Sequence, residues 1–126
     1  MDKKVFISYS SKDATYANLL ARTLKKKGVH VFTPQDIEAG ADWSETIRKA
    51  LQESSAVITL LSDNWTNSQY AAAEYGAAYA LGKKIIPILI DDIHDNLTID
   101  VNRFLMVNGK GEDLESVAER VEEALI

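Results

Sequence analysis

Cysteine is absent from this chain, and proline is rare, with two in 126 residues. The lack of cysteine excludes disulfide bonds and thiolate chemistry, and it suits a reducing cytoplasm. The N-terminus has no apolar stretch of the kind found in a signal peptide. The longest strongly apolar run, IIPILI at 85–90, is far too short to cross a bilayer. We therefore expect a cytoplasmic protein without a membrane partner.

Positive charge is also in short supply. Lysine and arginine number 14 against 19 acidic residues, so the formal net charge is −5. A general nucleic-acid binder normally carries a basic face, and this balance argues against nucleic acid as a partner. With 46% hydrophobic and 26% charged residues, the composition is that of a globular protein, and residues 1–126 suffice for a single domain with a substantial core.

Hydrophobic runs alternate with segments of helical periodicity along the chain. Strands are expected at 4–10, 29–33, 55–62, 84–90 and 103–108. Helices are expected at 13–27, 43–53, 67–81 and 112–126. This alternation predicts an α/β fold of the flavodoxin-like, doubly wound type, in which helices cover both faces of a five-stranded, mostly parallel sheet. Pro87 cannot donate to a sheet ladder, so we expect its strand to lie at an edge or to contain a bulge.

Ligands of such sheets bind beyond the carboxyl ends of the strands, and several common sites are missing from those segments. The sequence has no GxxxxGK[ST] phosphate loop, no GxGxxG and no serine on a G-x-S-x-G turn. His30 and His94 lie far apart and have no cysteine partners, so we expect no zinc or other metal site.

A phosphoacceptor receiver domain has the same size and strand–helix order, and it is one alternative. It needs acidic residues directly after the first strand, but YSSK occupies 9–12 and Asp13 is displaced into the start of the helix. Asp63 and Lys110 are placed tolerably for two further roles, but the magnesium site would be short of carboxylates.

The segment NSQYAAAEYGAAYA at 67–80 carries a single carboxylate, Glu74, among small and aromatic residues. On a helix, Tyr70 and Glu74 share one face and would present an aromatic wall and an acid, with small neighbours leaving room for a ligand. A glycine inside a helix lowers helix stability by about 1 kcal/mol relative to alanine. Gly76 therefore predicts that another part of the protein approaches the helix closely at this point. The simpler interpretation of Glu74 is an exposed residue on a helix surface.

Four segments in order resemble a bacterial TIR (Toll/interleukin-1 receptor/resistance) domain, and together they span essentially the whole chain. They are VFISYSSKD at 5–13, DIEAGADW at 36–43, SDNWTNSQYAAAEYGAA at 62–78 and GKKIIPILI at 82–90. Some members of that family are adhesive signalling modules. Others, including many bacterial and plant members, cleave the N-glycosidic bond of NAD, which releases nicotinamide and leaves ADP-ribose or a cyclic isomer.

The resemblance also implies roles for particular residues. Glu74 matches the catalytic glutamate of the NAD-cleaving members, and Tyr70 stands where they commonly have tryptophan. The residues that would contact NAD are Tyr9, Ser10, Ser11, Asp36, Glu38, Trp43 and Tyr70. Simpler interpretations exist for several of them: Ser10 and Ser11 as turn and capping residues, Glu38 as a solvated loop acid, and Trp43 as a packing anchor. We expect Trp65 in the core rather than in the pocket.

The chemistry of NAD cleavage fits a site with one acid. The pyridinium leaves as a neutral amine, so little acid catalysis is needed. The transition state resembles an oxocarbenium ion, and one carboxylate near the ribose can stabilise its charge or orient its hydroxyl groups. The backbone N–H groups and helix dipole at the helix start near Asp13 suit a pyrophosphate. NAD would be the substrate, and no cofactor is expected.

The resemblance therefore implies two possible functions. The first is an NAD-cleaving enzyme of bacterial immune, and specifically antiviral, signalling, whose site is completed when the loop at 34–42 packs against another TIR domain. The alternative is a non-catalytic TIR adaptor or effector that uses the same loop as its contact surface. The sequence leaves open whether a fused or separate sensor or effector domain accompanies it.

Overall fold

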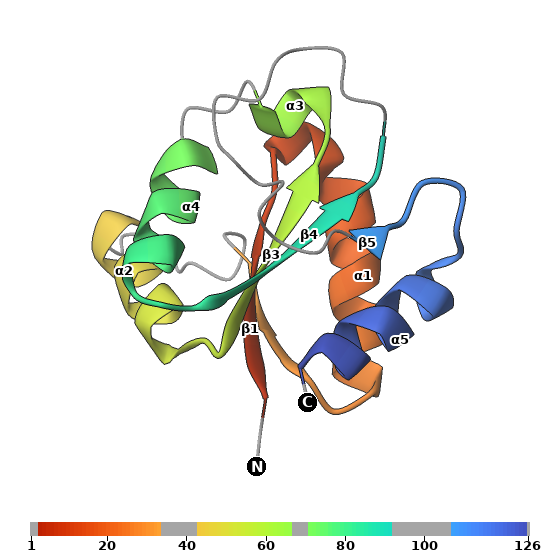
Figure 1. Cartoon of the computed structure of the whole chain (residues 1–126), viewed down its shortest axis with the longest axis horizontal. Helices are drawn as coiled ribbons and strands as arrows, with labels where there is room; N and C mark the ends of the chain where they lie inside the picture. Colours follow the sequence, from red (N-terminus) through yellow and green to blue (C-terminus); the bar gives the residue numbers. More distant parts are fainter. Residues whose placement is uncertain (1–2, 34–42, 67–70, 92–106, 126) are drawn as a thin grey trace.

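The computed structural model describes residues 3–33, 43–66, 71–91 and 107–125. Its centre is a five-stranded sheet with helices on both faces (Figure 1). The strands are β1 (Lys4–Ser8), β2 (His30–Phe32), β3 (Ala56–Leu61), β4 (Lys84–Leu89) and β5 (Val107–Asn108). Their order is β2-β1-β3-β4-β5 and every pairing is parallel. This is the flavodoxin-like order, so the predicted fold class is confirmed.

The helices lie in two layers. One layer contains α1 (Ala14–Lys26) and α5 (Leu114–Ala124), and the other contains α2 (Trp43–Glu53) and α4 (Ala71–Ala80) (Figure 1). A 3-10 turn, η1 (Ser11–Asp13), precedes α1, and a short helix, α3 (Asp63–Thr66), follows β3.

Local capping fixes the helix ends, which lie within a few residues of the predicted ones. The closing helix α5 begins at Leu114 because the side chain of Asp113 accepts a hydrogen bond from the backbone N–H of Ser116, at 2.8 Å. Helix α1 ends before Gly28, whose φ of 87° lies in the left-handed region that glycine adopts without strain.

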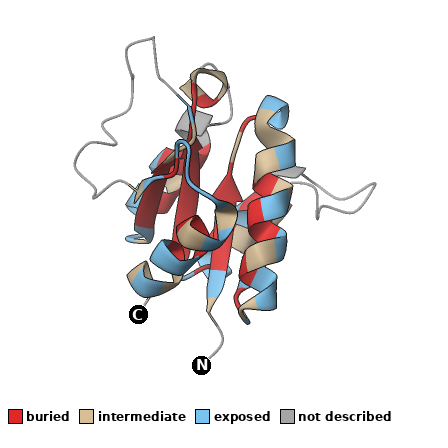
Figure 2. Ribbon diagram, turned by 90° about the vertical axis from the view of Figure 1, so that its right-hand side faces the viewer, coloured by how far each residue is buried: buried red, intermediate tan, exposed pale blue. Residues whose placement is uncertain are grey.

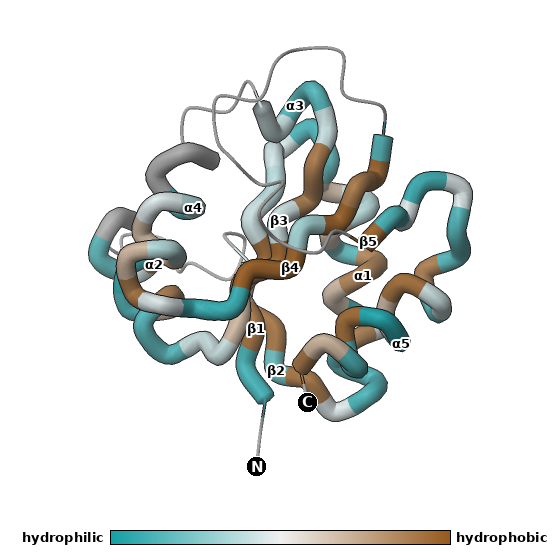
Figure 3. Tube along the Cα trace, in the orientation of Figure 1, coloured by the Kyte–Doolittle hydropathy of each residue, from teal (hydrophilic) through white to brown (hydrophobic). Residues whose placement is uncertain are grey.

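The core is divided by the sheet into two clusters, and alternate residues of β1 belong to opposite sides. Val5 and Ile7 pack with α1 and α5, whereas Phe6 packs with α2, Trp65 and Tyr75 on the other side. Strands β1, β3 and β4 are buried along most of their length (Figure 2), and hydrophobic stretches of the chain lie in the sheet (Figure 3). By the same alternation, Ser8 faces the α2 and α4 side at the carboxyl end of β1.

Pro87 lies in an internal strand, so the expectation of an edge position or a bulge is wrong. Strand β4 runs between β3 and β5 and pairs with β3 residue for residue along its whole length. The carbonyl of Leu89 accepts from the N–H of Gly109 on the β5 side, at 2.9 Å. Alternation places the nitrogen of Pro87 on that same side, where the described β4–β5 pairs begin only at Ile88. The missing donor therefore costs no bond in the ladder with β3.

Hydrogen bonds tie the carboxyl ends of β1 and β3 together. Asp13 accepts from Ser62 Oγ at 2.5 Å and from Asn64 Nδ2 at 3.1 Å. Ser62 Oγ in turn accepts from the backbone N–H of Trp65, also at 3.1 Å, and so caps the first turn of α3. Asp13 is therefore engaged in holding α3 against the start of α1.

We predict that Ser62→Ala lowers the free energy of unfolding by about 1–3 kcal/mol, because it leaves a partly buried carboxylate and a buried N–H without their partner. Urea denaturation followed by circular dichroism measures this difference. The matched control is Thr23→Ala, which removes an exposed hydroxyl that donates only to the carbonyl one helical turn before it. Equal effects of the two substitutions would contradict the tie between β1 and β3.

Candidate functional site

Glu74 is buried rather than exposed. It lies in α4 and only 6% of it is accessible to solvent, so the interpretation as a surface helix residue is wrong. Small residues on the same helix permit this position: Ala78 is completely buried against the sheet side. Gly76, however, is exposed, and a Cβ added there would meet no atom of the described residues within 4 Å. The close approach expected at Gly76 is therefore absent, and α4 packs through Tyr75 and Ala78 instead.

Glu74 receives a hydrogen bond from the end of β1. Ser8 Oγ donates to Glu74 Oε1 at 3.3 Å, and Trp65 Nε1 donates to Ser8 Oγ at 3.1 Å. Ser8 and Trp65 are both buried, which confirms the expected core position of Trp65. Ser8 was not among the predicted site residues. Its only indication was a polar residue on the α2 and α4 face at the end of an otherwise apolar strand.

The second carboxylate oxygen of Glu74, Oε2, differs from the first. Oε2 is buried and has no hydrogen-bond partner within the described part of the chain. Burial raises the pKa of Glu74 from 4.5 to about 7, and the hydrogen bond from Ser8 opposes part of that rise. A buried carboxyl group with one free oxygen and a pKa near neutrality is the kind of group found at functional sites.

The three residues at 9–11 that were predicted to contact NAD lie in different surroundings. Ser10 is buried and caps η1, because its Oγ accepts from the backbone N–H of Lys12 at 3.3 Å. Ser11 is exposed at the start of η1. Tyr9 packs against the cluster on the α1 and α5 side, opposite to the face that Ser8 and Glu74 share. The structure thus brings Ser8, and not Tyr9, to Glu74.

Other predicted site residues cannot be placed around Glu74. Asp36, Glu38 and Tyr70 lie outside the described residues, as does the loop at 34–42. Helix α2 begins at Trp43, whose side chain is likewise outside the described part.

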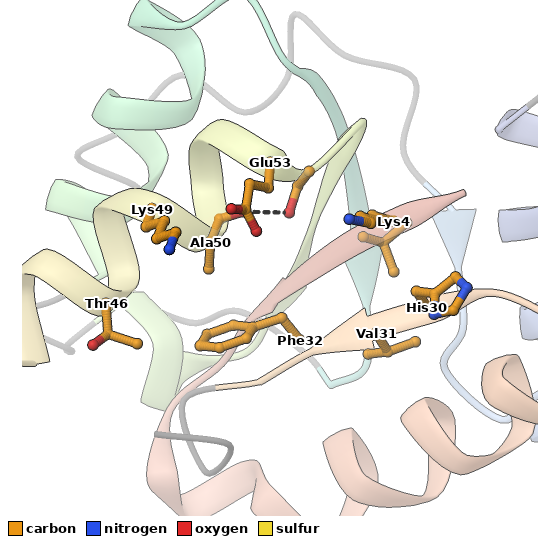
Figure 4. Close-up of a pocket in the computed structure, with 10 residues that line it drawn as sticks. Lys4, His30, Val31, Phe32, Thr46, Lys49, Ala50 and Glu53 are labelled. Atoms are coloured by element: carbon orange, nitrogen blue, oxygen red, sulfur yellow. Dashed lines mark hydrogen bonds between the residues drawn. The ribbon is translucent and has the colours of Figure 1, made fainter. Parts of the chain in front are cut away.

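A separate groove of about 340 Å³ lies between the edge strand β2 and helix α2 (Figure 4). Its walls include Val31 and Phe32 from β2 and Ala50 from α2, with Lys4 at the amino end of β1. The hydrogen bond drawn there joins Ser54 Oγ to the carbonyl of Ala50, at 2.7 Å. No lining residue of the groove belongs to the Trp65–Ser8–Glu74 chain, so the groove is distinct from the candidate site.

Among the described helices, none has the length and apolar character needed to cross a membrane. Within the same residues, no three histidine, cysteine or acidic side chains come together as a metal site.

A parallel α/β sheet in flavodoxin-like order, with a buried acid beside the end of its first strand, defines the class of this protein. The family follows from the sequence as well: a TIR-domain model matches residues 5–124, and the chain belongs to the TIR domain family. The uncharacterized protein YddK of Bacillus subtilis (strain 168) is 34% identical over an alignment of 86 residues, which covers 63% of this chain and 32% of that protein. The chain thus spans about a third of the length of this curated relative.

Solved structures with this fold include TIR domains and one glycosidase. The TIR domain of the Toll-related receptor TRR-2 from Hydra magnipapillata has a TM-score of 0.78 and 22% identity, covering 95% of this chain and 94% of that one. The TIR domains of the activated Roq1 resistosome have a TM-score of 0.67 and 22% identity, covering 98% and 72%. The CMP N-glycosidase BcmB of Clostridium botulinum has a TM-score of 0.64 and 19% identity, covering 95% and 99%. At these identities the likeness shows the fold.

We predict that burial of Glu74 gives the protein a distinctive pH dependence of stability. Between pH 4.5 and about 7 the folded protein holds a proton that the unfolded chain releases, so the free energy of unfolding falls as the pH rises through this window. The loss relative to Glu74→Gln is about 3 kcal/mol. Urea denaturation of both proteins at several pH values measures it.

The control for this prediction is Glu119→Gln, which changes an exposed acid on α5. Its stability should follow the wild-type curve. Parallel curves for wild type and Glu74→Gln would show that the carboxyl group titrates as it does in the unfolded chain, and would contradict the buried position.

Proposed function

We propose that this TIR domain is an NAD⁺ nucleosidase. It cleaves the nicotinamide–ribose bond of NAD and yields nicotinamide together with ADP-ribose or a cyclic ADP-ribose isomer. The observation that carries the proposal is the carboxyl group of Glu74, which is buried beside the carboxyl end of β1 with Oε1 held by Ser8 and Oε2 without a partner in the described residues.

The reaction needs the ionised form of Glu74. The bond between the ribose C1′ and the pyridinium nitrogen breaks, and its electron pair leaves with nicotinamide. Positive charge then develops on the ribose, where a nearby carboxylate stabilises it or holds the ribose hydroxyl groups. Water completes hydrolysis by attacking C1′, whereas a nitrogen of the adenine gives a cyclic product. With a pKa of about 7, Glu74 is ionised in about half of the molecules at neutral pH.

The comparisons support N-glycosidic chemistry on this fold. BcmB, which shares the fold along 95% of this chain, is by its name an N-glycosidase of CMP, another nucleotide with a base joined to ribose. In our proposal NAD is the substrate, no cofactor or metal takes part, and the pocket is completed by Ser10, Ser11, Asp36, Glu38, Trp43 and Tyr70. Tyr9, which packs on the α1 and α5 side, takes no part in it.

Assembly is the second part of the proposal. Structural neighbours include the TIR domains of the Roq1 resistosome and the heterodimer of the RPS4 and RRS1 TIR domains, so TIR domains of this fold associate with one another. We propose that this chain self-associates through the loop at 34–42, in cytoplasmic antiviral signalling that also involves a fused or separate sensor or effector domain.

We predict that the purified protein releases nicotinamide from NAD and that Glu74→Gln lowers the rate at least about 100-fold, because the glutamine cannot supply the negative charge. Chromatography of the reaction measures nicotinamide, and mass spectrometry identifies the ribose product. Glu119→Gln is the control and should retain full activity. An undiminished rate in Glu74→Gln would refute the proposal.

We also predict that the rate per molecule rises with protein concentration, since a site completed by a neighbouring domain forms only in the assembly. Nicotinamide release is measured over a range of protein concentrations, with and without a crowding agent. A rate strictly proportional to concentration, with no effect of crowding, would show that a single chain suffices.

The second candidate function is a non-catalytic adaptor or effector. The RPS4–RRS1 structure favours it, because in that structural neighbour two TIR domains form a heterodimer. Under this alternative, partner capture by the domain survives Glu74→Ala but is lost when Ile37 in the 34–42 loop is changed. If the domain captures a partner but releases no nicotinamide at any protein concentration, the adaptor function is the correct one.

A further inference from the structure

Three buried side chains from three separate elements form a directed chain of hydrogen bonds. Trp65 follows β3, Ser8 ends β1 and Glu74 lies in α4. The distances are 3.1 Å from Trp65 Nε1 to Ser8 Oγ and 3.3 Å from Ser8 Oγ to Glu74 Oε1. Each of the three residues is at most 6% exposed, so solvent does not compete for these bonds.

The direction of the chain is fixed by what each group can do. The indole N–H of Trp65 only donates, so it occupies a lone pair of Ser8 Oγ. The hydroxyl of Ser8 has one proton, and Glu74 Oε1 accepts it. A hydrogen bond given to a carboxylate favours its ionised form, which agrees with the lowering effect of Ser8 on the pKa of Glu74.

We propose that Trp65 and Ser8 are positioning residues for the reaction of Glu74. They hold Oε1 and thereby fix the carboxyl plane, so that Oε2, which has no partner among the described residues, is the oxygen presented to the ribose. This inference rests on the proposed function. Neither residue transfers a proton or touches the substrate: Ser8 acts through Glu74, and Trp65 acts through Ser8.

The residues of this hydrogen-bond chain are held by the sheet and by further hydrogen bonds. Ser8 is part of the central strand pair β1–β3, where it lies opposite Thr59. The backbone of Trp65 is held by Ser62, which is bonded to Asp13 at the start of α1. Burial raises the pKa of Glu74, and the hydrogen bond from Ser8 opposes this rise, so among the described residues Ser8 is the group that favours the ionised form.

The neighbouring strand offers a matched control. Thr59 is paired with Ser8, so its side chain leaves the sheet on the same face, and its hydroxyl is buried without a partner in the described part of the chain. Thr59→Val therefore removes a buried hydroxyl one strand away without touching the hydrogen-bond chain. A general effect of altering this part of the core would appear in it as well.

The experiment measures nicotinamide release against pH for wild type, Ser8→Ala, Trp65→Phe, the double variant and Thr59→Val. We expect Ser8→Ala to lower kcat about 10-fold, the loss of one hydrogen bond to a charged group, with little change in KM. Its activity should also rise at a higher pH than that of the wild type, because ionised Glu74 has lost its donor. Trp65→Phe should change both quantities in the same direction by less.

Non-additivity is the sharper expectation. Because Trp65 acts through Ser8, the double variant should be no slower than Ser8→Ala alone. Thr59→Val should keep the wild-type kcat and the wild-type pH profile. Additive losses, or a loss in Thr59→Val equal to that in Ser8→Ala, would overturn the inference, as would an unshifted pH profile in Ser8→Ala.

A readout without turnover separates this inference from the proposed function. Carbon NMR of the labelled glutamate carboxyl groups, with Glu74 assigned by its absence in Glu74→Gln, follows the titration of Glu74 directly. Its pKa should be higher in Ser8→Ala than in wild type and unchanged in Thr59→Val. A wild type that cleaves no NAD refutes the proposed function and the catalytic half of this inference. An unchanged pKa in Ser8→Ala refutes the contact itself, whatever the activity.

Discussion

The burial of one carboxyl group is the constraint around which this domain is organised. A charge removed from water is costly unless it is paired or bonded, and Glu74 receives only the hydroxyl of Ser8 among the described residues. The protein tolerates this cost because α4 carries small side chains and packs closely on the sheet. A buried carboxyl group with only one of its oxygens hydrogen-bonded among the described residues lowers the stability of the fold. The same group is well suited to bind a ligand that donates a hydrogen bond to the other oxygen.

The parallel sheet determines which groups meet that carboxyl group. Side chains of β1 alternate between two cores, so Ser8 reaches the α2 and α4 face whereas Tyr9 packs against the opposite one. The end of β3 lies beside the end of β1, which brings Trp65 within hydrogen-bonding distance of Ser8. Asp13 and Ser62 bind these same two chain segments together. The position of Glu74 is therefore set by the strand register, and the register is set by continuous hydrophobic pairing through the centre of the sheet.

Hydrophobic periodicity predicted every described strand and the four longer helices, because a doubly wound sheet needs apolar strands and amphipathic helices in alternation. The short helix α3 was not predicted. Glu74 was noticed as a lone acid among alanines, and the resemblance to TIR domains, not the periodicity, gave it a functional role. Ser8 could not be found in this way: its partners are 57 and 66 residues distant along the chain, and only the folded register brings them together. The prediction of an edge position for Pro87 was wrong because the sequence does not show toward which neighbouring strand the nitrogen of Pro87 points. The close contact predicted at Gly76 was also wrong, because the sequence alone does not show the neighbours of a helix residue. Gly76 faces solvent.

The most direct test of the account is a structure of the protein bound to a non-cleavable carbocyclic analogue of NAD. We predict that the sugar ring joined to nicotinamide lies against Glu74, with a hydroxyl group of that ring at about 3 Å from Oε2 and Ser8 still bonded to Oε1. An analogue bound elsewhere, for example in the groove between β2 and α2, with Glu74 shielded from its sugar, would contradict the assignment of Glu74 as the catalytic residue.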